Sequence, residues 1–156
     1  MRAAFDDSAI GMAVVGLDGR FQRINRFLCD ILGYSEGEIV GLPFAEITHP
    51  DDLEESLAYR LRLLEGDIAS FQTEKRYRRK SGDWMWALLT TSLLRDSSGR
   101  PLHFISQIQD IADRKRAEGR RAAQFAVTRA LSETSTLEGA ASRILEAVCR
   151  SLDWEL

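Results

Sequence analysis

The sequence predicts an α+β domain: a five-stranded antiparallel sheet with helices on one face, followed by a long C-terminal helical extension. Two short strand patterns lie near the N-terminus and three longer ones follow residue 70, with helix patterns between them. Turn residues fall between the strands at hairpin spacing, which makes the strands antiparallel neighbours. Such segregation of strands from helices is typical of α+β domains.

The first elements are a short cap and a hairpin. Residues 1–10 are expected to form an N-terminal helical cap. The apolar run Gly11–Leu17 ends at the turn signal Asp18-Gly19, and Phe21–Ile24 follow as a second strand. The two strands are therefore predicted to pair as a hairpin.

Helical segments come next. Asn25 is suited to cap a helix that ends at Gly33, and the stretch SEGE after it has the spacing of a capping box. The stretch PFAEI is a short turn of helix. Pro50 is suited to the first position of a longer helix, since its missing N–H would be unpaired there, and Gly66 can end that helix.

Three longer strands are predicted at Phe71–Lys80, Asp83–Arg95 and Leu102–Ile111. The middle strand is apolar on both faces. One face carries Met85, Leu89 and Leu93, and the other carries Trp86, Leu88 and Leu94. One face should cover the core, and the other should meet a helix or a second chain, because exposed apolar patches of this size are unfavourable in water.

Residues 112–134 are predicted to form a helix that continues the last strand without a turn. One broad face of this helix is apolar, formed by Ala122, Ala123, Phe125, Ala126, Val127, Ala130 and Leu131. A lone helix of this length is marginal in water, so pairing with its copy as a coiled coil is expected. The alternative is a helix folded back on its own sheet.

Five stretches carry a family resemblance: IGMAVVGLDGRFQRIN, LGYSEGEIVG, HPDDLEE, EKRYRRKSGDWMWALL and QDIADRK. In this order they resemble a PAS domain with its C-terminal PAC motif, also called a sensory box, over residues 11–111. The resemblance implies the PAS fold and makes residues 112–134 a signalling helix or coiled-coil linker. Residues 135–156 resemble the first helix of a GAF-like domain, cut before its sheet.

Composition excludes several classes of function. A net charge of -3 gives no support for nucleic-acid binding. No apolar run reaches the roughly 18 residues that a membrane span needs, and no signal peptide is present, so membrane contact is not expected and the location is expected to be cytoplasmic. Nucleophile elbows, P-loops and HExxH motifs are absent from the sequence, so the chain is not expected to be an enzyme.

Cofactor sites are disfavoured by the few candidate ligands. His49 precedes the long helix, whereas PAS domains that bind haem use a histidine inside it, so His49 is interpreted as a cap. Cys29 lies among apolar residues on the preceding helix rather than where flavin-binding relatives carry their cysteine. No cofactor is therefore predicted, with flavin and haem both disfavoured, and no metal site is expected.

The PAS resemblance implies a cavity between the sheet and the central helices. Its candidate lining is Phe27, Ile31, Phe44, Ile47, Leu53, Leu57, Trp86, Leu88, Ser106 and Ile108. This set favours a small apolar ligand, and solid packing of the same side chains is the alternative. Arg76 is expected to point outward with Glu74 and Arg78 as a solvated cross-strand ladder; the alternative is an inward side chain that could meet an anionic ligand.

The stretch QDIADRK resembles the Asp-Ile-Thr motif of PAS domains, where the closing strand becomes the signalling helix. Asp110 and Ile111 keep the motif and Ala112 replaces its threonine, so these three residues are the expected signal junction. The resemblance implies a bacterial signalling protein in which ligand or partner binding passes through a homodimer, formed by the helical extension and the sheet, to a downstream output domain.

That output domain is expected to be a histidine kinase of a two-component system, a diguanylate cyclase or a phosphodiesterase. A flavin- or haem-bearing redox or gas sensor, and a ligand-free dimerisation scaffold, remain as alternatives.

Overall fold

The computed structural model describes residues 2–133, 145–148 and 150. The chain divides into two compact units between Ile111 and Ala112, and each is described by itself. The predicted GAF-like helix at 135–156 falls mostly outside the described residues. Within that stretch, 145–148 and 150 are helical.

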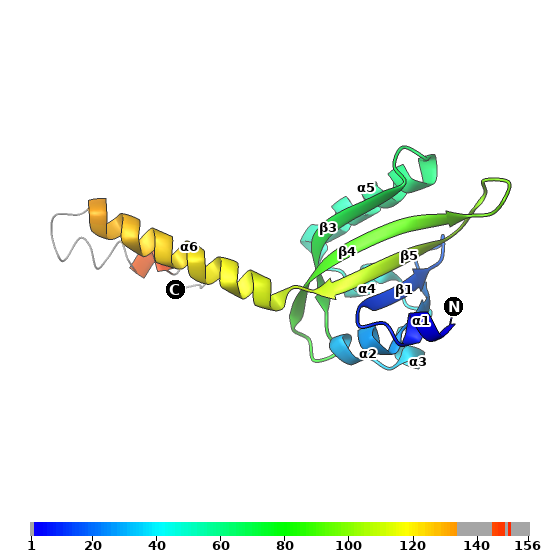
Figure 1. Ribbon diagram of the computed structural model, residues 1–156, viewed down its shortest axis with the longest axis horizontal. Helices are drawn as coiled ribbons and strands as arrows, with labels where there is room; N and C mark the ends of the chain where they lie inside the picture. The colour runs from blue at the N-terminus through cyan, green and yellow to red at the C-terminus, as the bar shows by residue number, and fades with distance from the viewer. Residues whose placement is uncertain (1, 134–144, 149, 151–156) are drawn as a thin grey trace. The chain divides into compact units, whose positions relative to one another are not determined.

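The first unit contains five helices and five strands in its described part (Figure 1). In chain order they are α1 (Arg2–Asp6), β1 (Gly11–Val15), β2 (Phe21–Ile24), α2 (Arg26–Leu32), α3 (Glu36–Ile39), α4 (Phe44–Ile47), α5 (Pro50–Glu65), β3 (Ser70–Arg78), β4 (Trp84–Arg95) and β5 (Pro101–Asp110). The second unit begins with α6 (Ala112–Glu133).

The strands form one antiparallel sheet in the order β2-β1-β5-β4-β3, which confirms the predicted fold class. The closing strand β5 lies in the centre, paired with β1 on one side and β4 on the other. Figure 1 shows α5 running along β3, and α2 packs against β1 and α3 against β2. The strand that ends at the junction is therefore held by both halves of the sheet.

The helix ends confirm the predicted caps. The Asn25 side chain accepts a hydrogen bond from the Leu28 N–H, and Gly33 and Gly66 adopt left-handed conformations after α2 and α5. His49 caps α5, because its Nδ1 accepts from the Asp51 N–H at 3.1 Å. These local signals could be predicted because each depends on residues only a few positions apart.

Alternation along β4 separates the core from the outer sheet face. Met85, Ala87, Leu89 and Thr91 are buried beneath the helices. On the opposite side, Trp84 and Leu94 are 42% and 43% exposed. The outer sheet face comprises Met12, Val14, Trp84, Trp86, Leu88, Leu94 and Ile105. The prediction that β4 is apolar on both faces is confirmed.

In the second unit, α6 extends over 22 residues. Phe125 is 70% exposed and Leu131 is 56% exposed. Ala123, Ala126 and Val127 are half-buried on the same helix. Within the described residues, no helix has the length and apolar character required to cross a membrane.

Candidate functional site

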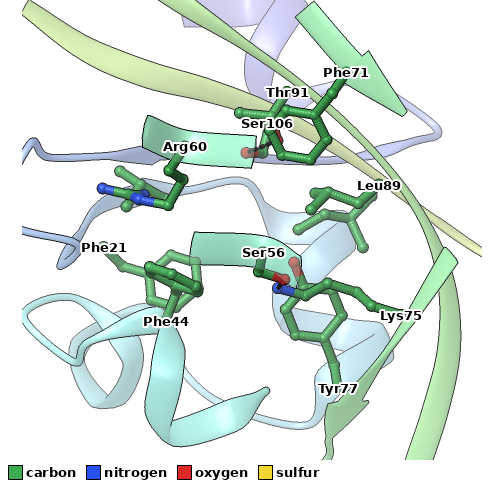
Figure 2. A pocket seen from close by; sticks show the side chains of 12 residues that line it. Phe21, Phe44, Ser56, Arg60, Phe71, Lys75, Tyr77, Leu89, Thr91 and Ser106 are labelled. Carbon is green, nitrogen blue, oxygen red and sulfur yellow. Dashed lines mark hydrogen bonds between the residues drawn. The ribbon is translucent and has the colours of Figure 1, made fainter. Parts of the chain in front are cut away.

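A cavity lies between α5 and the inner face of the sheet, with α4 at one side (Figure 2). It offers about 30 Å³ to the centres of water-sized molecules, which is room for about two such molecules. Its lining consists of Val15, Phe21, Phe44, Ser56, Arg60, Phe71, Lys75, Tyr77, Leu89, Thr91, Ser106 and Ile108. The lining is mostly apolar and aromatic, with a few polar groups directed inward.

Lys75 is the most unusual of the lining residues. It lies on β3 between Phe71 and Tyr77 on the inner face, and only 2% of its surface is exposed. Its Nζ lies 3.3 Å from the Ser56 hydroxyl and 4.6 Å from the centroid of the Tyr77 ring. Burial, which penalises the charged amine, lowers the pKa of Lys75 to about 7.

Arg60 enters the cavity from α5, one helical turn after Ser56 (Figure 2). Its guanidinium lies 4.7 Å from the centroid of the Phe44 ring and 4.0 Å from that of Phe104. It also donates a long hydrogen bond of 3.3 Å to the Gly16 carbonyl. Burial lowers the pKa of Arg60 to about 10, which leaves the guanidinium charged at neutral pH.

The carboxylate that acts most strongly on Lys75 is already engaged elsewhere. Asp52 receives two hydrogen bonds from the Arg76 guanidinium, at 2.8 and 3.0 Å, and one from the Arg76 N–H. These bonds hold the pKa of Asp52 below its usual value. Within the described residues, no carboxylate lies within 4.0 Å of the Lys75 or Arg60 nitrogens.

The far wall of the cavity carries two hydroxyl groups. Thr91 on β4 and Ser106 on β5 are opposite each other in the register, and their oxygens lie 2.8 Å apart. Both residues are buried. Tyr77, fully enclosed beside Lys75, has a pKa raised by burial, so its phenol stays protonated. The cavity can therefore offer hydrogen bonds from hydroxyls as well as positive charge.

The structure brings three of the ten predicted lining residues to the cavity: Phe44, Ser106 and Ile108. Ile31, Ile47 and Leu53 pack in the surrounding core, and Phe27 is half-buried on α2. Three further positions need correction. Leu57 is 51% exposed because it lies on the solvent side of α5, and Trp86 and Leu88 belong to the outer sheet face.

Sequence analysis missed Lys75 and Arg60 as site residues. The signal for Lys75 was present, since period-two alternation from Phe71 to Tyr77 places the intervening lysine on the buried face. Arg76 was the cation on this strand that could have met an anionic ligand. Its side chain lies on the outer side of the sheet, as predicted, where the guanidinium is 4.9 Å from the centroid of the Trp86 ring and pairs with Asp52.

The predicted junction residues follow one another at the end of the sheet. Asp110 closes β5, and its carboxylate lies 3.4 Å from the guanidinium of Arg79, next to the β3–β4 turn. Ile111 is buried, and its N–H donates to the Trp86 carbonyl at 3.0 Å. Ala112 begins α6. One residue therefore separates a central strand from a long helix.

The cavity does not fit a flavin or a haem in this conformation. Pockets that enclose ligands of that size measure about 300–1,000 Å³, far more than the space between α5 and the sheet. Cys29 lies on α2 and His49 caps α5, and neither lines the cavity. Among the described residues, no three His, Cys, Asp or Glu side chains are grouped to hold a metal ion.

Comparisons of the sequence with known proteins point to one family. The family described as "PAS fold" matches residues 22–108. "Probable diguanylate cyclase DgcE" of Escherichia coli (strain K12) is 47% identical over 117 residues, which are 75% of this chain and 11% of that protein. The chain spans 11% to 18% of the length of three curated relatives that it matches.

Solved structures agree with this result. The structure of a "Sensory Box Histidine Kinase/Response Regulator" from Burkholderia thailandensis E264 is 28% identical, with a TM-score of 0.63, over 82% of this chain and 97% of that chain. The Rhodobacter sphaeroides LOV protein shares the fold at 19% identity and a TM-score of 0.63, over 97% of this chain and 90% of that chain.

Proposed function

The chain belongs to the PAS fold family, and we propose that it binds a small ligand in the cavity beneath α5 and relays binding through a dimeric α6 to an output domain. The PAS fold is a sensory fold without catalytic activity of its own, although relatives that contain it are parts of enzymes. The observation that carries the proposal is the direct passage from β5 through Asp110 and Ile111 into α6.

The position of β5 supports the relay. Ser106 and Ile108 of β5 line the cavity, and the same strand ends two residues later at Asp110. A ligand that moves β5 would act on the Asp110–Arg79 ion pair and on the hydrogen bond from Ile111 to Trp86. Small displacements of a packed strand can bias a helix between two arrangements.

The surfaces outside the core support dimerisation. Phe125 and Leu131 of α6 and Trp84 of the outer sheet face are large apolar side chains left exposed. Apolar patches of this kind commonly mark protein–protein contacts. We therefore assign both surfaces to a homodimer, with α6 pairing as a coiled coil.

The relatives suggest what lies downstream. One relative is named as a probable diguanylate cyclase, and two others as sensor proteins, one of them a histidine kinase. By analogy, the output domain is a diguanylate cyclase or a histidine kinase. We also propose that the sensor works in the cytoplasm. A ligand-free dimerisation scaffold is the second candidate, favoured by the small size of the cavity.

The relay is tested by changing Asp110→Ala in the full-length protein. Output activity is measured after small molecules are removed and again after a small-molecule extract of the host cell is added. The unchanged protein should respond, and Asp110→Ala should keep basal activity but lose the response. Asp67→Ala is the matched control, because Asp67 is exposed and remote in sequence from the junction.

A normal response by Asp110→Ala would overturn the relay. Absence of a response in the unchanged protein would favour the scaffold instead. Circular dichroism of each variant verifies that the PAS unit remains folded.

A further inference from the structure

We propose that the cavity binds a small organic monocarboxylate, whose carboxylate group is held by Lys75 and whose apolar part lies among the aromatic rings. This inference rests on the ligand-sensing function proposed above and adds the chemical class of the ligand. It goes beyond the apolar ligand that the sequence favoured.

The cavity lining carries positive charge without a matching negative charge. Lys75 and Arg60 both line the cavity, whereas none of its lining residues is acidic. A buried cation is costly unless it is paired, and the described part of the chain supplies neither cation with a carboxylate within 4.0 Å. An anionic ligand would supply the missing countercharge.

The hydrogen bonds at Lys75 leave donors available to a ligand. The Ser56 hydroxyl donates to the Asp52 carbonyl at 3.0 Å, so its lone pair is directed to the Lys75 Nζ. A protonated lysine has three donors. The hydroxyl accepts one of them, and two remain to meet a carboxylate in a site that water barely reaches.

The remaining lining distinguishes among anions. Figure 2 shows the Lys75 amine beside Ser56 and the Tyr77 ring, and the centroid of the Phe44 ring lies 5.1 Å from it. The rest of the apolar lining includes Phe21, Phe71 and Leu89. Inorganic phosphate is strongly hydrated and would lose that hydration against these rings, whereas an aliphatic carboxylate presents an apolar body to them. The cavity volume of about 30 Å³ restricts the ligand to a short chain, and the lining side chains must move apart to admit it.

Arg60 adds positive potential from the opposite side. Its guanidinium and the Lys75 amine lie 4.7 and 5.1 Å from the centroid of the same Phe44 ring. The Arg60 guanidinium points away from the Lys75 amine (Figure 2) and donates to the Gly16 carbonyl. Its charge therefore attracts an anion into the low-dielectric cavity without contacting it directly.

Protonation of Lys75 couples binding to pH. The charged and titratable groups around its amine are Arg60 and Asp52 on α5 and Tyr77 on β3. Arg60 is charged and Tyr77 is neutral at pH 8, and Asp52 is ionised, so Lys75 is the group that changes state near pH 7. A bound carboxylate stabilises the ammonium form, so binding above pH 7 takes up a proton.

The test is calorimetry on the full 156-residue chain with propionate and its neutral isostere propionamide, each at pH 6 and pH 8. Propionate should bind at least about tenfold more tightly than propionamide. At pH 8, measurements in buffers of different ionisation enthalpy should show that the protein takes up about one proton when propionate binds. Its affinity should fall from pH 6 to pH 8.

Lys75→Met removes the amine and keeps an unbranched side chain of similar length. It should weaken propionate binding about 10- to 100-fold and abolish proton uptake, while propionamide binding is unchanged. Arg78→Met is the matched control, since Arg78 is an exposed cation on the same strand. That variant should bind propionate as the unchanged chain does.

Three outcomes would overturn the assignment. They are no propionate binding at millimolar concentration, equal binding of propionate and propionamide, and propionate binding without proton uptake at pH 8. The last readout needs no variant, so it holds even if Lys75→Met fails to fold. A response of the full-length protein to cell extract would leave ligand sensing intact in each case.

Discussion

Lys75 holds an amine where water scarcely reaches it. Its nearest polar partner is a serine hydroxyl at 3.3 Å, and two aromatic rings account for much of its remaining surroundings. Hydrophobic residues at this position of the inner sheet face would pack without a desolvation cost. The buried lysine therefore lowers the stability of the fold but provides a charge that can respond to a ligand.

The stability of the protein should depend on pH through this residue. The pKa of Lys75 is about 7 in the folded chain and near its usual 10.5 when the chain unfolds. Between these values the unfolded state binds more protons, so the free energy of unfolding attributable to Lys75 rises with pH, by up to about 1.4 kcal/mol per pH unit. Below pH 7 this contribution stays at its minimum.

Urea titrations of the ligand-free chain from pH 6 to pH 10 measure this dependence, with Lys75→Met as the reference. The difference in unfolding free energy between the two should grow in favour of the unchanged chain as pH rises above 7. Parallel curves over the whole range would contradict a perturbed lysine.

Asn25 is the residue on which the N-terminal part of the PAS unit depends most. Its fully buried side chain accepts from the N–H groups of Met12 and Leu28 and donates to the carbonyls of Phe5 and Ile10. Asn25→Ala leaves these groups unpaired and should lower the free energy of unfolding by about 3 kcal/mol or more.

Ser35→Ala provides the comparison for Asn25. It removes an exposed capping hydroxyl from α3 and should cost only about 1 kcal/mol. Equal losses for the two variants, measured by urea unfolding, would show that Asn25 acts only as a helix cap.

At the scale of elements, hairpins and caps could be predicted because their signals are local. Asp18-Gly19 leads into an observed β1–β2 hairpin, and Pro50 begins α5 as expected. The cavity lining was harder to predict, because it depends on which face of each element meets the core. Leu57 shares an apolar stripe with Leu53 in the sequence, yet only Leu53 packs inward.

The strand β3 illustrates the same limit. Charged residues occupy most of its positions from Glu74 to Arg78, so it resembles a solvated edge strand in composition. Alternation still directs Lys75 inward and Arg76 outward. The outward position of Arg76 was predicted, but the same alternation, which places Lys75 on the buried face, was not followed to that residue.

We expect α6 to pair with its copy through its apolar face. Val127 is half-buried on the apolar face and Thr128 beside it is exposed. Val127→Glu should convert a dimer of the full chain to a monomer, because it places a charge in the helix seam. Thr128→Glu should remain a dimer, since valine and threonine have similar helix propensities.

Light scattering after size-exclusion chromatography distinguishes these states. A monomer for the unchanged chain would contradict the coiled coil. A monomer for both variants would show that added negative charge, rather than the apolar face, controls assembly.

Across the PAS unit, a cavity beneath α5 is connected to the residue at which α6 follows the sheet, Ile111. The cavity and the junction share β5, whose residues contact both. The exposed apolar side chains of α6 and of the outer sheet face give the proposed dimer two contact surfaces. Signal transfer then requires that the two α6 helices change their arrangement together.

The most direct measurement is the distance between spin labels at Thr128→Cys in the two protomers, with the native cysteines replaced by serine. We expect one defined distance, a shift in that distance when the small-molecule extract is added, and no shift in Asp110→Ala. The relay through a dimeric α6 would be contradicted by the lack of a distance between protomers, or by the same shift in Asp110→Ala as in the unchanged protein.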